Sequence, residues 1–417
     1  MSSTYLNPKV GAGCDPVDAW YRYYAGYSAG FVEQALKAAG DKARLVLDPW
    51  NGTGTTTVVS ASKNIPAVGF DLNPALVVIS RARLLGAGVW ASIEPLGEDI
   101  ISHAGSVALP EEPLGFWFAP EASGTLRALQ RSAHRLLVDP GGTSRPAYQT
   151  ASDMSTLAAF FYTVLFRTVR LLIAPRAGTN PTWWKRVAED QRLDPTREEV
   201  LAQFRTSAVE LAAGLHRDNF DGGVDVSVAL GDSRQLPLAD GSGDAVITSP
   251  PYCTRIDYGV ATRPELAVLG AGEHDLTQLR HKMVGTPTMT GNHGTPTDWG
   301  PSAAEFLAGV AGHDSKASSG YYTKYFQQYY AGMWDSLGQL RRVLRDGAPA
   351  VLVVQDNHYK DLHNDTARIL SEMGGRLGFS FNERHDFPVT RNRASMNPRT
   401  RQYRARASAV ESILVLR

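Results

Sequence analysis

The stretch 248–252, Thr-Ser-Pro-Pro-Tyr, contains the residues whose types and spacing are best suited to chemistry. It follows the short run Asp-Ala-Val-Ile at 244–247, which is typical of a buried strand. Consecutive prolines donate no backbone hydrogen bonds, so the chain must leave this strand in a stiff, extended loop. The Ser249 hydroxyl and the loop carbonyls can accept hydrogen bonds, and Tyr252 offers an aromatic face. The loop could therefore hold a planar ring that bears an amino group, or it could be a proline-rich turn with a packed tyrosine.

A second motif lies near the N-terminus. The apolar run 45–47 leads into Asp-Pro-Trp-Asn-Gly-Thr-Gly-Thr-Thr at 48–56, which predicts a strand, a glycine-rich turn and a helix start. Glycines let the backbone approach a ligand closely, and a helix N-terminus favours negative charge. The spacing is neither the dinucleotide G-x-G-x-x-G nor the G-K-[S/T] of a phosphate loop. The run 68–70 then predicts a second strand that ends in Asp71, where an acid commonly accepts hydrogen bonds from ribose hydroxyls.

Together these motifs resemble those of the amino-group DNA methyltransferases, which use S-adenosylmethionine (SAM). Asp-Pro-x-x-Gly-x-Gly-Thr-Thr at 48–56 is similar to their cofactor motif, and Ser-Pro-Pro-Tyr at 249–252 is similar to their catalytic motif. The serine variant is similar to the N4-cytosine enzymes, whereas adenine enzymes more often carry Asp or Asn in that place. The resemblance covers residues 19–85 and 224–417 and implies SAM as the cofactor and DNA as the substrate.

The resemblance also implies which residues bind SAM. An aromatic segment before the cofactor motif would contact the methionine end, and an acid after a later strand would lie near the adenine ring. The implied cofactor-binding residues are Tyr24, Ser28, Phe31, Asp48, Pro49, Trp50, Gly52, Gly54, Thr55, Thr56, Asp71, Leu72, Asn73, Asp232 and Ser233. Two alternatives stay open, a packed aromatic helix start at 20–32 and a turn-capping role for Asp232. Trp50-Asn51 stands where the family has Phe and a small residue, so the edge of the adenosyl pocket is expected to differ.

The same resemblance implies direct attack by the exocyclic amine of a base. The lone pair of that amine is delocalised into the ring, and acceptors on its hydrogens would localise it. The implied catalytic residues are Ser249, Pro250, Pro251 and Tyr252. Tyr252 would stack on a base that is flipped out of the duplex. Methylation of a ring carbon would need a cysteine nucleophile in a Pro-Cys pair, which this sequence lacks, so Cys253 is expected to be a buried bystander.

Composition limits the remaining possibilities. The 417 residues contain 42 Lys plus Arg and 42 Asp plus Glu, so nucleic acid must be held by a local patch rather than by net charge. The only cysteines, Cys14 and Cys253, are far apart and predict neither a disulfide framework nor a CxxC metal site. We find no cationic, apolar leader and no uninterrupted apolar run of membrane-spanning length. These features favour a cytoplasmic protein without a metal or a membrane partner.

Apolar runs at 45, 67, 224, 244 and 350, interleaved with helices, predict an α/β, Rossmann-like methyltransferase fold. Its mostly parallel, twisted sheet would carry helices on both faces. A last strand is predicted at 411–416, and helices at 54–63, 75–85, 321–344 and 365–374. Residues 1–85 and 222–417 would form the catalytic domain, and 86–221 a mainly helical insert that recognises the target. The Gly-, Thr-, Pro- and His-rich segment 271–319 predicts a long mobile or ligand-ordered loop.

DNA contacts are expected from the insert and from the tail 384–406, which holds seven arginines and one acid. The candidate DNA-binding residues are Arg255, Tyr258, Arg399, Arg401 and Arg404. An Arg255–Asp257 pair could instead only pin the loop, and the insert arginines could form solvated helix faces. Rival functions are N6-adenine methylation, methylation of RNA or a protein amide, and an inactive SAM-binding subunit. The recognition sequence, a partner restriction or phage-defence nuclease, and a monomeric or dimeric state stay open.

Overall fold

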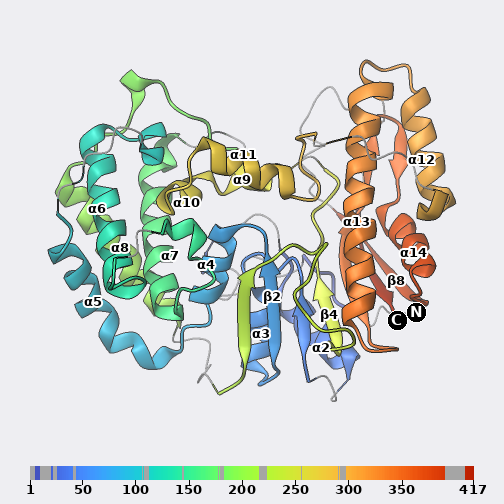
Figure 1. The fold of residues 1–417 in the computed structure, drawn as a ribbon, viewed down its shortest axis with the longest axis horizontal. Coiled ribbons are helices and arrows are strands. Elements are labelled where there is room, and N and C mark those ends of the chain that lie inside the picture. Colours follow the sequence, from blue (N-terminus) through green and yellow to red (C-terminus); the bar gives the residue numbers. More distant parts are fainter. Residues whose placement is uncertain are drawn as a thin grey trace.

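A single mixed sheet forms the centre of the described residues (Figure 1). The computed structural model describes residues 5–9, 20–21, 26–40, 44–105, 107, 112–142, 145–176, 178, 183–215, 223–254, 256–289, 291, 297–389 and 409–417. The strand order is β3-β2-β1-β4-β5-β9-β8, in which β9 alone runs antiparallel to both of its neighbours. This confirms the predicted α/β, Rossmann-like methyltransferase fold. The strands are β1 (Val46–Asp48), β2 (Ala67–Asp71), β3 (Val226–Leu230), β4 (Ala245–Thr248), β5 (Ala350–Gln355), β8 (Phe381–Val389) and β9 (Ala409–Leu416).

Helices cover both faces of this sheet. The α-helices of the described ranges are α2 (Ala29–Ala39), α3 (Thr55–Ser62), α4 (Pro74–Ala82), α5 (Trp90–Ser102), α6 (Pro120–Leu137), α7 (Thr156–Ile173), α8 (Arg197–Leu215), α9 (Tyr258–Ala261), α10 (Arg263–Val268), α11 (Glu273–Lys282), α12 (Pro301–Gly312), α13 (Thr323–Val343) and α14 (Thr366–Arg376). A hairpin of β6 (Asn357–Tyr359) and β7 (Leu362–Asn364) follows β5. The predicted helices 54–63, 75–85, 321–344 and 365–374 correspond to α3, α4, α13 and α14.

Alternate residues of the central strands enter two separate cores. Val46 and Ile247 pack with α2 and α3, whereas Leu47 and Val246 pack with α13 and α14 on the opposite face. Both faces are therefore covered, which explains why these strands are continuous apolar runs rather than alternating patterns. Because the parallel strands all end at one edge, the loops that follow β1, β2, β3 and β4 come together there.

Between β2 and β3 the described residues are helical, and they contain no strand longer than the isolated bridge Phe118–Leu193. Helix α7 is the centre of this insert and packs against α4, α6 and α8. The span Thr156–Arg176 is long and apolar enough to cross a membrane, but 67% of it is buried inside the protein. Its apolar character is explained by this packing, because Phe160, Phe161 and their neighbours fill the interior of the insert.

Two expectations from composition are wrong. Part of the segment 271–319 forms α11 and α12 rather than a long loop, because apolar residues of α12, such as Phe306 and Val310, pack with α13. Residues 381–389, most of which the sequence assigned to a basic tail, form β8 against β9. Arg384 in β8 pairs with Asp365 and Asp386, so its charge is used within the fold.

Candidate active site

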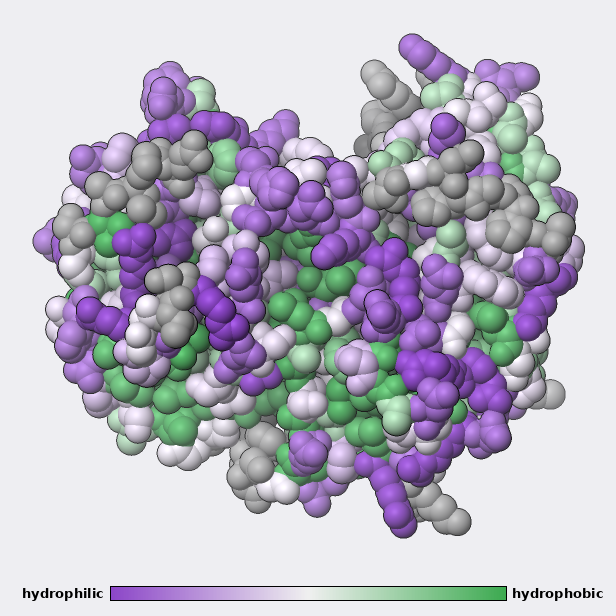
Figure 2. All heavy atoms as spheres, viewed as in Figure 1, coloured by the Kyte–Doolittle hydropathy of each residue, from purple (hydrophilic) through white to green (hydrophobic). Residues whose placement is uncertain are grey.

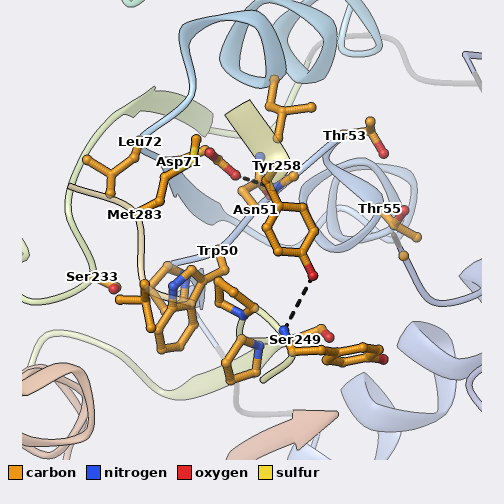
Figure 3. A pocket seen from close by; sticks show the side chains of 18 of the residues that line it. Trp50, Asn51, Thr53, Thr55, Asp71, Leu72, Ser233, Ser249, Tyr258 and Met283 are labelled. Carbon is orange, nitrogen blue, oxygen red and sulfur yellow. Dashed lines mark hydrogen bonds between the residues drawn. The ribbon is translucent and has the colours of Figure 1, made fainter. Parts of the chain in front are cut away.

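The two sequence motifs line one pocket at the carboxyl ends of β1, β2, β3 and β4. Figure 3 shows Asp71 and Leu72 at one end of it and Ser249 at the other, with Trp50 and Tyr258 between them. The walls combine backbone from the glycine-rich turn with apolar and aromatic side chains. The predicted residues that line the pocket are Pro49, Trp50, Gly52, Thr55, Asp71, Leu72, Ser233, Ser249, Pro250, Pro251, Tyr252 and Tyr258.

The glycine-rich turn needs its glycine at position 54. Gly54 has a φ of +88°, and a Cβ built there would lie 2.1 Å from Ser80 Oγ, so α4 packs directly against the turn. Asn51 fastens the turn from inside, since its Nδ2 donates to Ser80 Oγ over 2.7 Å and its Oδ1 accepts from Thr57 Oγ1. A Cβ on Gly69 would lie 2.4 Å from Asn51 Cγ. The missing side chain at Gly69 therefore makes room for the Asn51 side chain.

Asp71 presents a carboxylate to the pocket. Its Oδ2 accepts from the Gly52 N–H over 3.0 Å and its Oδ1 from the Asn73 N–H over 2.8 Å, so each oxygen keeps a lone pair. Burial raises the pKa of Asp71 to about 6, although these hydrogen bonds oppose the shift. At neutral pH the group is an acceptor, which is what two neighbouring hydroxyl groups would need.

The catalytic loop is held by hydrogen bonds at both of its functional side chains. Ser249 Oγ donates to the Val353 carbonyl over 3.0 Å, and the Tyr252 hydroxyl donates to Glu411 Oε1 over 2.5 Å. The Tyr258 hydroxyl accepts from the Tyr252 N–H over 3.3 Å. Burial, and then the charge of Glu411, raise the pKa of Tyr252 well above its ordinary value, so the ring stays neutral.

Cys253 follows this loop but points into the interior. Its side chain is 3% exposed, and burial raises the pKa of the thiol above its ordinary value. A nucleophilic cysteine needs the opposite shift, because the thiolate is the reactive form. The geometry therefore disfavours attack by this sulfur.

No family model matches the chain. Among curated proteins it is similar to Type II methyltransferase M.AvaI of Nostoc sp. strain PCC 7120, with 26% identity over 410 residues that cover 88% of this chain and 79% of that protein. It is also similar to Type II methyltransferase M.BsoBI of Geobacillus stearothermophilus, with 24% identity over 308 residues that cover 63% of this chain and 54% of the relative. The chain is a distant homologue of type II methyltransferases. Among solved structures, an rRNA methyltransferase, aviRa from Streptomyces viridochromogenes, aligns over 94% of this chain and 86% of its own with a TM-score of 0.28 and 10% identity.

Several predicted residues of this methyltransferase homologue lie behind the pocket wall. Asp48 is 1% exposed and accepts from the Tyr27 hydroxyl, from Thr248 Oγ1 and from the Trp50 N–H, so it joins β1 to β4. Thr56 donates to the Ile247 carbonyl below the same wall. Five further predicted residues do not line the pocket but stabilise the elements around it. Ser28 and Asn73 cap helices α2 and α4, Phe31 is a core residue, Gly54 contacts Ser80, and Asp232 is paired with Arg234.

Other residues line the pocket without having been predicted. Tyr27 does so three residues after Tyr24, which lies outside the described part of the chain. The predicted N-cap at Ser28 indicates that Tyr27, the residue before it, lies in the loop that leads into helix α2. Met283 and Val284, just after α11, also reach the pocket. No pattern in the sequence predicts this, because the composition of 271–319 is typical of a loop.

The expected DNA-binding residues fall into two groups. Tyr258 lines the pocket, whereas Arg255, Arg399, Arg401 and Arg404 lie outside the described residues.

The arginines of the insert are largely used inside the protein. Arg127 pairs with Glu112 and donates to the Ala267 and Val268 carbonyls, and Arg170 pairs with the buried Glu265. These two residues therefore join the insert to α10, and the phosphate-contact interpretation does not hold for them. Arg131 and Arg135 remain on the exposed face of α6.

Proposed function

We propose that this protein is a DNA methyltransferase that uses SAM to methylate the exocyclic N4 amine of cytosine. The observation that carries the proposal is that Ser-Pro-Pro-Tyr at 249–252 and the glycine-rich turn with Asp71 line the same pocket. The distant homology to type II methyltransferases supports the reaction class, and the serine of the loop favours cytosine within it.

The residues of the pocket fit SAM. Asp71 offers acceptors for the ribose hydroxyls, and Leu72 with Trp50 offers apolar surface for the adenine ring. Gly26 and Tyr27 line the same pocket and would hold the methionine part. When bound, SAM supplies an electrophilic methyl group on sulfur.

Ser249 and Tyr252 would prepare the amine. Because the hydrogen of Ser249 Oγ is donated to the Val353 carbonyl, its lone pairs remain as acceptors for the amine hydrogens. Together with the Pro250 carbonyl, they would localise the nitrogen lone pair. The Tyr252 ring would stack on the cytosine, and holding both reactants in one pocket would supply much of the rate.

DNA would reach this pocket between two parts of the molecule. Figure 2 shows hydrophilic side chains over α11 and a hollow at the upper edge of this face, between the insert and the lobe of α12 and α13. Met283, which follows α11, lines the pocket. Residues 1–85 with 222–417 would form the catalytic domain in a cytoplasmic enzyme, and 86–221 would recognise the target sequence.

Nucleoside mass spectrometry tests the proposal. DNA from cells with and without this chain is digested to nucleosides and weighed, with a Tyr252→Ala variant as the matched control. N4-methylcytosine that depends on Tyr252 is the expected result. N6-methyladenine would move the protein to the adenine enzymes, and 5-methylcytosine or unmodified DNA would reject the mechanism.

A further inference from the structure

Three segments that are far apart in the sequence meet at the hydroxyl end of Tyr252. Glu411, in β9, accepts the hydrogen of that hydroxyl over 2.5 Å. Lys9, in the N-terminal segment, has its Nζ 3.7 Å from Glu411 Oε1 and 5.6 Å from the centroid of the Tyr252 ring. Neither residue lines the pocket. They lie behind the aromatic side chain that the proposed function places against the target base.

Glu411 is an unusual residue for its strand. Its side chain is 1% exposed, and its Oε2 has no hydrogen-bond partner among the described residues. Ser412, which is also buried, donates its hydroxyl hydrogen to Asp386, and the next residues, Ile413, Leu414 and Val415, are apolar and buried. A buried carboxylate is costly unless it is paired, so this position opposes the stability of the sheet. The contact that it makes with Tyr252 offers a reason for its presence.

We propose that Glu411 is a positioning residue that fixes the ring of Tyr252 through its hydroxyl group, with Lys9 compensating the buried charge. This inference rests on the proposed function only in assigning the ring to base stacking. A hydrogen bond at the far end of a tyrosine side chain holds the hydroxyl oxygen in place, and this fixes the direction of the ring axis that rotation about the Cα–Cβ bond would otherwise change.

Two substitutions separate positioning from proton acceptance. A glutamine at 411 keeps an oxygen that can accept the Tyr252 hydrogen, but it cannot take up a proton at neutral pH. An alanine keeps neither property. If Glu411 only positions the ring, Glu411→Gln retains kcat within about threefold, whereas Glu411→Ala loses about 10- to 100-fold, the scale of a misplaced reacting group. Loss of activity in Glu411→Gln equal to that in Glu411→Ala would overturn the proposal.

The matched control is Glu383→Ala in the neighbouring strand β8. Glu383 is 37% exposed and pairs with His385, so its loss should leave the kinetics unchanged. SAM affinity by calorimetry should also be unchanged in both Glu411 variants, because Glu411 does not reach the pocket.

A double-mutant cycle tests whether Glu411 affects the rate through the Tyr252 hydroxyl. If Glu411 acts through the Tyr252 hydroxyl, Tyr252→Phe combined with Glu411→Ala should be no slower than Glu411→Ala alone. Additive losses would mean that Glu411 acts elsewhere and would overturn the inference.

A measurement that needs no methyl transfer keeps this inference distinct from the proposed function. With 3-fluorotyrosine at position 252, ¹⁹F NMR of the wild-type chain should give one sharp line. Glu411→Ala should broaden or split it, while Glu411→Gln and Glu383→Ala should not. An unchanged line in Glu411→Ala would reject the anchor, even in an active enzyme. If the anchor is present but no DNA is methylated, the proposed function fails instead.

Discussion

Burial raises the pKa of Asp71 to about 6, which makes the proposed ribose contact sensitive to pH. Below that pH the carboxyl group is mostly protonated and loses the acceptors that the ribose hydroxyls need. SAM affinity should therefore be constant above about pH 7 and fall by up to about tenfold per pH unit below about pH 6. Calorimetric titration between about pH 5 and about pH 7 measures this dependence, because the α-amino group of SAM titrates above this range, at about pH 7.7–8.0.

Asp71→Asn provides the control for this dependence. The variant should bind SAM more weakly at pH 7.5 and show a flat profile, since the asparagine amide does not titrate. A profile in the variant as steep as in the wild type would place the titrating group elsewhere, and unchanged affinity would place the ribose contact elsewhere.

Substitutions in the catalytic loop should affect the chemical step more than cofactor binding. Ser249→Ala removes one acceptor from the amine and should lower the single-turnover rate on the order of 10²-fold, as for other lost transition-state hydrogen bonds. Tyr252→Ala should lose more, because both the stacking surface and the orientation of the base disappear. Calorimetry should find SAM affinity unchanged in both variants. A Ser249→Ala enzyme with a wild-type rate would assign the acceptor role to another group.

The residue types in the two motifs were sufficient to predict most of the pocket wall, because each motif is contiguous in sequence. The anchor of Tyr252 could not be predicted in this way. Glu411 approaches the loop because β9 pairs with β5, and Lys9 because the neighbouring Pro8 carbonyl accepts from the Ser28 N–H. Contacts over such separations leave no local pattern in the sequence. Tyr27 and Tyr24 are equally aromatic, so only the described backbone assigns Tyr27 to the pocket.

At the scale of elements, the fit of Asn51 under Gly69 joins the glycine-rich turn to β2. Gly69→Ala would bring a Cβ to 2.4 Å from Asn51 Cγ, and overpacking of this kind costs roughly 1–3 kcal/mol. Thermal unfolding should show this loss, and SAM affinity should fall because the turn moves.

Asn51→Ala tests whether the Asn51 side chain causes the loss of stability expected for Gly69→Ala. That substitution removes the three atoms nearest to the added methyl group, Asn51 Cγ, Nδ2 and Oδ1, so Gly69→Ala should cost clearly less than in the wild type. An equal cost in both backgrounds would mean that the strain arises from another neighbour.

Strands were easier to predict than the C-terminal elements. The strands β4 and β5 are buried on both faces, so they are short apolar runs bounded by turn residues. Strand β8 has few buried residues and carries Arg384, His385 and Asp386, which resemble a polar tail. Helix α12 is short and rich in small residues, and its neighbours in sequence are rich in Gly and Thr. Contacts with α13, α14 and β7 stabilise it, and sequence composition does not report those contacts.

At the scale of the whole molecule, a chain with equal numbers of acidic and basic residues must concentrate its positive charge to hold DNA. Arg399, Arg401 and Arg404 belong to the arginine-rich segment 384–406, and their contact with DNA stays a prediction. Replacing all three with Ala should weaken DNA binding and flatten the slope of log affinity against log salt by up to about 2.7, at about 0.9 per phosphate contact. Fluorescence anisotropy at several salt concentrations measures this slope, with Arg368→Ala on α14 as a control. An unchanged slope would place the DNA elsewhere.

The ties between the insert and α10 have a consequence for how such an enzyme could change its target sequence during evolution. Leu266 and Val268 of α10 belong to the same core as α7, and Arg127 and Arg170 bind groups of α10 or its flanks. A chimera that received residues 86–221 from a relative would place foreign side chains against these partners. The insert and the segment 258–271, which follows the catalytic loop, are separate in the sequence but pack against each other. Their residues would therefore be expected to change together during evolution.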